Sequence, residues 1–227
     1  MIINDLSCGD IVVQQLHLGG DRNFSYIFGD RTGGEAAIVD PGFGPDELAA
    51  AVSGTGLELA HILITHGHAD HTGGVARLVE LTGARVYALP VATGAPARSV
   101  AFPDRLGARS LVALETPGHA SDHLCWLYEG FLATGDLLFC GKVGGTGPFF
   151  PGSSAAAEWA SLHRILELPG DTVVLPGHDY YGGEGEMPHS TLAHERAHNP
   201  FLLCPDLEAF EQLKADWAAY KREHGIR

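Results

Sequence analysis

The chain has 227 residues, of which 45% are hydrophobic and 19% are charged, and its formal net charge at pH 7 is −14. This length and composition are typical of a soluble globular protein with one sizeable core. The acidic balance and the lack of a basic run of five or more residues argue against nucleic acid as a partner. Because no apolar run reaches the ~20 residues that a membrane span needs, we expect no membrane partner either.

The cysteines and the N-terminal residues indicate the compartment. Cys8, Cys125, Cys140 and Cys204 are widely spaced and form no CxxC motif. They are typical of reduced, mostly buried thiols in a cytoplasmic protein. The first five residues lack the basic and apolar regions of a secretory signal. The sequence leaves the oligomeric state open.

Short strands and helices follow one another in the first half of the chain, separated by turn residues. The predicted strands are Ile11–Leu18, Phe24–Phe28, Ala36–Val39, Ile62–Ile64 and Arg85–Ala88. The predicted helices are Pro45–Val52, with proline in its first turn, and Val75–Leu81, capped by Gly83. The stretch 90–108 is rich in alanine, proline and glycine and predicts no clear element.

The second half repeats the pattern. Its predicted strands are Leu111–Leu114, Leu124–Tyr128, Phe131–Thr134 and Thr172–Leu175, and its predicted helices are Ala155–Leu166, Thr191–His198 and Pro205–His224. Strands that precede helices in both halves predict a layered α/β sandwich with the helices outside. We expect one domain over residues 1–227, with a short C-terminal helical extension at 205–227.

One segment carries most of the functional information. It reads Thr65-His66-Gly67-His68-Ala69-Asp70-His71 and places three imidazoles and a carboxylate within six positions. Imidazole and carboxylate are ligands that suit zinc and iron. Such groups are costly to bury unpaired, and a metal compensates for that cost. The segment therefore predicts a metal site.

Three later strands end in the same way. His119 follows Pro117-Gly118, Asp136 follows Thr134-Gly135, and His178 follows Pro176-Gly177. Taken singly, each could be an ordinary loop histidine or turn aspartate. Catalytic groups, however, usually lie on loops at strand ends of a rigid sheet. Together with the first segment, these residues complete a set of seven candidate ligands.

Over nearly its whole length, the sequence resembles the metallo-β-lactamase fold superfamily. The resemblance implies a four-layer αββα sandwich, with Asp40 as the strand-terminal aspartate before the metal segment. It implies two divalent metal ions, zinc first, with iron or manganese as alternatives. Their ligands would be His66, His68 and His119 for one ion, Asp70, His71 and His178 for the other, and Asp136 bridging both.

Two such ions can share a water and lower its pKa, so we expect a metal-bridging hydroxide as the nucleophile of a hydrolase. Asp70 is the candidate catalytic residue because it can bind a metal and also orient the hydroxide or carry its proton. No Ser-His-Asp or Cys-His set is needed for this chemistry.

Two stretches resemble the glyoxalase II (hydroxyacylglutathione hydrolase) branch. The first is Gly135–Lys142, and the second is Ser190–Glu195, closed by Asn199-Pro200-Phe201. The resemblance implies hydrolysis of a thioester of the S-acylglutathione class, with Lys142 and Tyr180 contacting the glutathione part. A fixed cation at Lys142 would suit an anionic substrate entering an acidic protein.

The chain departs from that branch in two places. Six residues, 143–148, separate Lys142 from the aromatic pair Phe149-Phe150, which lies almost directly after the cation in glyoxalase II. The long C-terminal helical domain is reduced to residues 205–227, where Lys214, Lys221 and Arg222 are the available cations.

Other activities remain open from the sequence. A persulfide dioxygenase would hold one Fe(II) with His66, His119 and Asp136 and act on glutathione persulfide. That family has an Arg-Thr-Asp-Phe run where this chain has residues 142–145, which counts against it. A lactonase is a further alternative, and a non-enzymatic metal-binding scaffold is the alternative outside catalysis.

Overall fold

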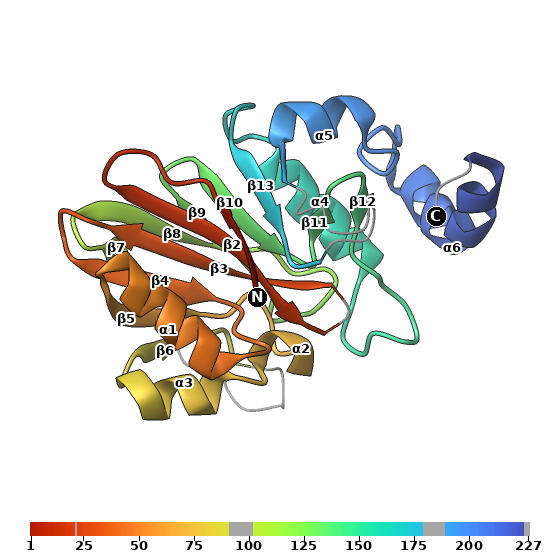
Figure 1. The fold of residues 1–227 in the computed structure, drawn as a ribbon. Coiled ribbons are helices and arrows are strands. Elements are labelled where there is room, and N and C mark those ends of the chain that lie inside the picture. Colours follow the sequence, from red (N-terminus) through yellow and green to blue (C-terminus); the bar gives the residue numbers. More distant parts are fainter. Residues whose placement is uncertain (21, 91–101, 179–188, 225–227) are drawn as a thin grey trace.

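The computed structural model describes residues 1–20, 22–90, 102–178 and 189–224. They form two six-stranded β-sheets and one two-stranded sheet. Figure 1 shows the two large sheets lying against each other, with helices on the outer side of each. The predicted α/β sandwich is confirmed, and Tyr180 lies outside the described residues.

The first sheet comes from the N-terminal half. Its strands, in spatial order, are β1 (Ile2–Asp5), β2 (Ile11–Gly19), β3 (Asn23–Asp30), β4 (Glu35–Val39), β5 (Glu58–Leu63) and β6 (Arg85–Tyr87). The pairs β1–β2, β2–β3 and β3–β4 are antiparallel, whereas β4–β5 and β5–β6 are parallel. Helices α1 (Pro45–Thr55) and α3 (Val75–Thr82) lie in these two parallel crossovers, as such connections require.

The second sheet comes from the C-terminal half. Its strands, in spatial order, are β14 (Ser190–Thr191), β13 (Val173–Pro176), β10 (Phe131–Gly135), β9 (Leu124–Tyr128), β8 (Arg109–Glu115) and β7 (Arg105–Leu106). Between β10 and β13, which are parallel, the chain forms the small hairpin of β11 (Leu138–Phe139) and β12 (Lys142–Val143) and helix α4 (Ala155–Ile165). Helices α5 (Leu192–His198) and α6 (Leu207–His224) follow.

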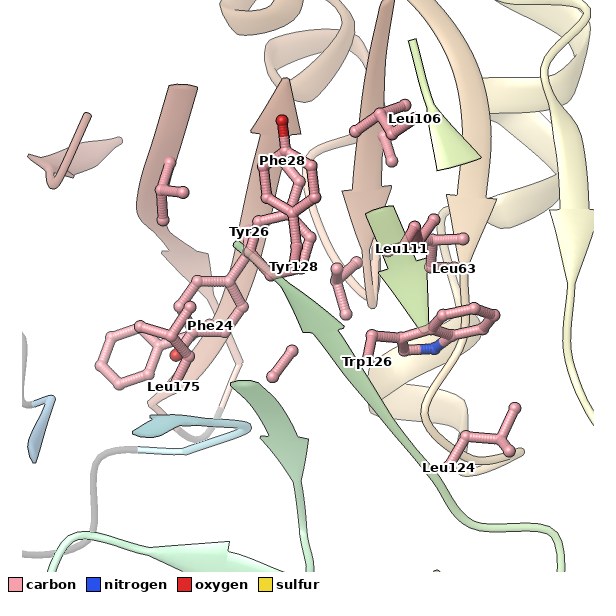
Figure 2. Close-up of a cluster of buried hydrophobic side chains, with 14 residues drawn as sticks. Phe24, Tyr26, Phe28, Leu63, Leu106, Leu111, Leu124, Trp126, Tyr128 and Leu175 are labelled. Atoms are coloured by element: carbon pink, nitrogen blue, oxygen red, sulfur yellow. The ribbon is translucent and has the colours of Figure 1, made fainter. Parts of the chain in front are cut away.

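Alternation along the strands builds the layers. In β3, Ile27 packs with residues of α1 and α3, whereas its neighbour Phe28 packs between the sheets. The inter-sheet core is aromatic, and Figure 2 shows Tyr26, Phe28, Trp126 and Tyr128 within it. The outer face of the second sheet packs on α4, α5 and α6. Each sheet is buried on both faces, by the other sheet on one side and by helices on the other, which gives four layers.

The core aromatics also connect the two sheets through their polar atoms. The Trp126 indole N–H donates to the carbonyl of Ile64 at 3.1 Å, and the Tyr26 hydroxyl donates to the carbonyl of Pro176. A buried Trp or Tyr normally finds such a partner. Each acceptor lies two residues before a candidate ligand, His66 or His178, so the core packing positions the segments that carry them.

Each predicted strand and helix is present with small differences at its ends, and the structure adds short elements that were not predicted. The sequence prediction missed β1, an exposed edge strand, and α2 (Ala69–Thr72), a single turn inside the histidine segment. Strand β7 lies in the stretch where no element was predicted. Among the described residues, no helix is long and apolar enough to cross a membrane.

The prediction of mostly buried cysteines is wrong. All four thiols are free, but only Cys125 is buried, whereas Cys8 is exposed. Burial raises the pKa of the Cys125 thiol to about 12, which keeps it protonated at neutral pH.

Gly42 permits a close approach between the loop after β4 and α2. A Cβ at this position would lie 1.7 Å from the carbonyl oxygen of Asp70. Gly54, in α1, has no atom within 4 Å of its would-be Cβ. The two glycines therefore form a matched pair for substitution.

We expect Gly42→Ala to lower the free energy of unfolding by about 1–3 kcal/mol through overpacking. Gly54→Ala should raise it by about 0.5–1 kcal/mol, because alanine is the better helix former. Urea denaturation of both variants measures the difference. Equal shifts in the same direction would contradict the close approach at Gly42.

Candidate metal centre

The buried carboxylate of Asp40 organises the histidine segment. Asp40 directly follows β4 and has a φ of 48°, a left-handed conformation uncommon for a non-glycine residue. Its Oδ1 accepts from the backbone N–H of Thr65 at 2.7 Å, and its Oδ2 accepts from the Thr65 hydroxyl at 2.6 Å. The strained backbone thus aims both oxygens at the start of the segment.

Asp40 also determines which ring nitrogens are protonated. Its Oδ2 lies 2.9 Å from Nδ1 of His71 and can only accept, so this nitrogen carries the hydrogen. Because the Thr65 hydroxyl gives its one hydrogen to Asp40, it accepts from Nδ1 of His66 at 3.0 Å. In the neutral rings of His66 and His71, Nε2 is therefore left with a free lone pair.

His119 has the same tautomer for a different reason. Its Nδ1 lies 2.7 Å from the carbonyl oxygen of Gly145, which can only accept. His119 Nε2 therefore carries a lone pair and lies 3.1 Å from Nδ1 of His68. Orientation of a ligand histidine through its outer N–H is the usual arrangement at metal sites.

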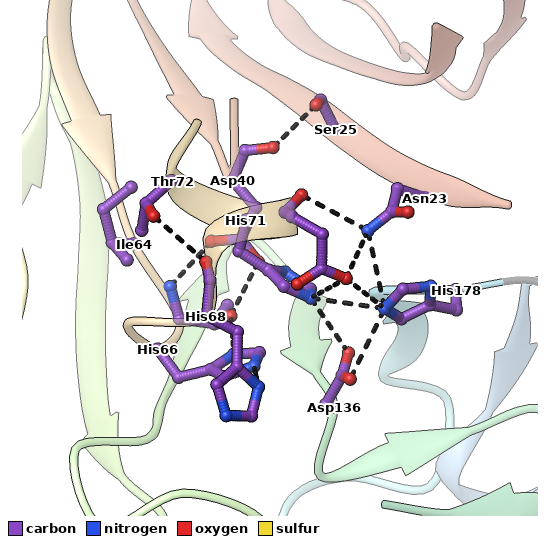
Figure 3. Close-up of polar contacts among 12 residues, drawn as sticks. Asn23, Ser25, Asp40, Ile64, His66, His68, His71, Thr72, Asp136 and His178 are labelled. Carbon is purple, nitrogen blue, oxygen red and sulfur yellow. Dashed lines mark hydrogen bonds and ion pairs between the residues drawn. The ribbon is translucent and has the colours of Figure 1, made fainter. Parts of the chain in front are cut away.

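The structure brings the seven predicted ligands together, although their backbone positions span residues 66–178. Their ligand atoms form three groups within which all distances are below 4.8 Å. The groups are His66/His68/His119, His66/His71/Asp136 and Asp70/His71/His178. Asp136 lies between the first and the third group. One of its oxygens is 3.4 Å from Nε2 of His71 (Figure 3), and the other is 3.6 Å from Nε2 of His119.

These contacts fit a cation and are poorly satisfied by hydrogen bonds alone. The lone pairs of His66 and His119 both point at Nδ1 of His68, at 2.8 and 3.1 Å, and that atom offers at most one hydrogen. Among the described residues, Asp136 Oδ1 has no hydrogen-bond partner although it is buried. A divalent ion would satisfy each of these atoms, so the donor set fits a metal.

The electrostatic surroundings favour the ligand forms of His66, His119 and Asp136. Burial lowers the pKa of His66 and of His119, so both rings are neutral near pH 7. Burial alone would raise the pKa of Asp136, but the imidazoles of His71 and His178 bring that pKa well below its ordinary value. Neutral imidazole and ionised carboxylate are the forms that bind metals.

The sequence analysis missed two polar residues that support the ligands. The Asn23 side-chain amide donates to Oδ2 of Asp70 at 3.0 Å and to the Asp70 carbonyl. Nε2 of the fully buried His123 accepts from the backbone N–H of Asp136 at 3.2 Å. Asn23 lies at a strand start and His123 four residues after His119, and neither position carries a motif that reveals this role.

Of the two residues predicted to contact substrate, Lys142 and Tyr180, the structure describes only Lys142. Lys142 is half-buried at the start of β12, where its carbonyl accepts from the Asn199 side chain at 3.2 Å. Glu195 accepts from the Gly141 N–H at 2.9 Å and from Asn199 at 2.9 Å. Glu195 and Asn199, from the second stretch that resembles glyoxalase II, thus hold the turn that carries Lys142. The contact of Lys142 with substrate stays a prediction. The described residues do not include Tyr180.

Lys214 is not available as a substrate cation. Its ammonium group pairs with Glu158 and donates to the carbonyl of Gly144, and its side chain is only 10% exposed. The suggestion that this residue replaces a cation of the glyoxalase II C-terminal domain is therefore wrong. The side chains of Lys221 and Arg222 lie outside the described part of the chain.

Comparison with protein families adds to the geometry. The metallo-beta-lactamase superfamily matches residues 18–110 and 101–178, which include all seven predicted ligands. The chain belongs to the metallo-beta-lactamase superfamily. A divalent metal requirement follows from this membership and from the clustered His and Asp ligands.

Similar proteins within the superfamily indicate the branch to which the chain is related. A hydroxyacylglutathione hydrolase of Fuscovulum blasticum is 33% identical over 235 residues, which cover 85% of this chain and 86% of that protein. The crystal structure of ETHE1 from Myxococcus xanthus has a TM-score of 0.76 at 29% identity, covering 96% of this chain and 91% of that one. The crystal structure of TTHA1623 in a di-iron-bound form has a TM-score of 0.68 at 33% identity, covering 83% and 99%. The predicted relationship to the hydroxyacylglutathione hydrolase branch, and with it the metallo-hydrolase class, is confirmed.

His68 and His178 belong to different ligand groups, which gives a test of the predicted ligand sets. We expect His68→Ala and His178→Ala each to retain about half of the metal bound by the unaltered protein after dialysis, because each removes a direct ligand from one group only. Elemental analysis measures the metal content.

His194→Ala is the matched control, because His194 is exposed on α5. It should keep the full metal content. Unchanged metal in His68→Ala would contradict its place as a ligand.

Proposed function

We propose that this protein hydrolyses thioesters of the S-acylglutathione class with two divalent metal ions, zinc being the first choice. The observation that carries the proposal is the pair of ligand groups on either side of Asp136, in a chain whose curated relatives are named hydroxyacylglutathione hydrolase. A solved relative described in a di-iron-bound form supports a count of two and keeps iron in consideration.

The bound metal pair would supply a water of lowered pKa and a Lewis acid for the thioester carbonyl. The chain's own residues prepare the site for this chemistry. Asp40 and Thr65 hold the rings of His66 and His71 in one tautomer, so the Nε2 lone pairs of both rings stay available to a metal without reorganisation. Such preorganisation is the main source of electrostatic stabilisation in enzymes.

Asp70 is placed for proton transfer as well as binding. The side chain is 41% exposed, in contrast to the neighbouring His71 at 1%. Its hydrogen bond with His178 lowers the pKa of Asp70 strongly, so the carboxylate is ionised, which is the form that binds a metal and accepts a hydrogen bond from the nucleophile. We assign Asp70 the role of orienting the nucleophile and receiving its proton.

The substrate side of the site is formed by the loop after β12. The ring of Phe150 lies 4.9 Å from that of His119 and 6.5 Å from that of His68, measured between centroids. Its neighbour Phe149 is 91% exposed. We propose that Phe150 contacts the acyl group and that Lys142 binds a glutathione carboxylate, since a chain of net charge −14 needs a local cation to hold an anion.

Elemental analysis beside three activity assays tests the proposal. Purified protein should contain two equivalents of metal and cleave S-lactoylglutathione. One equivalent of iron with oxygen uptake on glutathione persulfide would instead establish the dioxygenase alternative. Hydrolysis of a lactone without thioester cleavage would establish the lactonase. The four free cysteines support the expected cytoplasmic location of such an enzyme.

We expect Lys142→Ala to raise KM for the glutathione thioester about tenfold while kcat changes less, because the lost contact binds substrate and transition state alike. Steady-state kinetics measure the two constants separately. Arg85→Ala is the control, since Arg85 is an exposed cation in the edge strand β6 of the other sheet. An unchanged KM in Lys142→Ala would remove this residue from the site.

A further inference from the structure

A buried ion pair links the C-terminal helix to the loop beside the metal centre. Lys214, in α6, pairs with Glu158, in α4, whose side chain is fully buried. The same ammonium group donates to the carbonyl oxygen of Gly144 at 2.6 Å. The pair therefore joins two helices and one loop.

That loop contacts two candidate ligands. The carbonyl of Gly145 is the acceptor for the Nδ1 hydrogen of His119, at 2.7 Å. A Cβ on Gly144 would lie 2.0 Å from the backbone oxygen of Asp136 and 3.0 Å from Cβ of His119. A small displacement of the Gly144–Gly145 peptide would therefore shift the hydrogen-bond acceptor of His119. It would also disturb the packing of the peptide against His119 and Asp136.

Helix α4 touches the other side of the His119 segment. A Cβ on Gly118 would lie 2.5 Å from Cα of Glu158. The Ser161 hydroxyl, one turn further along α4, donates to the carbonyl of Pro117 at 2.7 Å. Glu158 thus packs against the residue before His119, while its partner Lys214 holds the residue before Gly145.

The C-terminal helix is anchored well enough to hold this contact. Phe210 is fully buried in the cluster formed by α4, α5 and the second sheet. Its ring lies 5.1 Å from that of Trp159, and the ring of Trp217 lies 4.6 Å from that of Phe201. Lys214 lies one turn after Phe210 on this packed helix.

We propose that Lys214 is a positioning residue for the metal centre, holding the Gly144–Gly145 peptide so that Gly145 fixes the tautomer and direction of His119. The inference rests on the metal centre of the proposed function and is independent of the substrate. A buried ion pair adds little stability compared with apolar residues of similar size. Its hydrogen bond to Gly144, which an apolar pair would not make, is the contact that reaches the site.

Three variants separate positioning from simple stabilisation. Lys214→Met alone leaves the Glu158 carboxylate buried without its cation, which can unfold the protein. The double variant Glu158→Gln with Lys214→Met has no unpaired buried charge but loses the hydrogen bond to Gly144. Glu158→Gln alone keeps Lys214 and that bond; the ammonium group loses its anion but can still donate to the Gln amide oxygen as well as to Gly144. Glu211→Gln, at an exposed position of α6, is the surface control.

Zinc affinity, measured by competition with a chromophoric chelator, and the electronic spectrum of the cobalt-substituted protein are the readouts. We expect the double variant to fold, with a native circular dichroism spectrum, to bind the weaker of its zinc ions about 10–100-fold less tightly, and to show altered cobalt bands. Glu158→Gln and Glu211→Gln should bind zinc as the unaltered protein does.

A folded double variant with zinc affinity within twofold of the unaltered protein would overturn the proposal, as would an equal loss in Glu158→Gln. These results do not depend on any assay of thioester cleavage. Failure of the substrate assignment would leave the zinc measurements interpretable, and failure of this inference would leave the thioester assay unaffected.

Discussion

One buried carboxylate sets the chemistry of the whole centre. Asp40 accepts three hydrogen bonds, from the backbone and hydroxyl of Thr65 and from Nδ1 of His71. Through Thr65 it also sets the tautomer of His66. If Asp40 were replaced by a group that donates, Thr65 and His71 would lose their acceptor, and Nε2 would no longer be the atom reserved for the metal. The left-handed backbone at Asp40 is the local cost of this arrangement.

The sheets bring the remaining ligands to the same place. His66 and His68 follow β5 of the first sheet, whereas Asp136 and His178 follow the parallel neighbours β10 and β13 of the second. The carboxyl ends of parallel strands share one edge, so Asp136 and His178 become neighbours through the register alone. Hydrogen bonds from Trp126 and Tyr26 then tie that edge to the inter-sheet core.

The sequence was sufficient for the layers and for the seven clustered side chains, because hydrophobic alternation and ligand spacing are local patterns. It was insufficient wherever a role arises only from packing. Asn23 and His123 act through contacts with residues 47 and 13 positions away, and a lone Asn or His carries no signal for this. The sequence predicts Lys214 as an available cation, because nothing local indicates that Glu158, 56 residues earlier, is its buried partner.

The two sheets supply ligands to one centre, so a bound ion would form a bridge across the seam between the halves of the fold. An ion that binds only the assembled halves shifts the equilibrium toward the native state as its free concentration rises. The lifetime of the protein would then follow the supply of the ion, because the unliganded form opens more often to proteases. In cells starved of that ion, the chain would be lost through turnover rather than stored as an inactive pool.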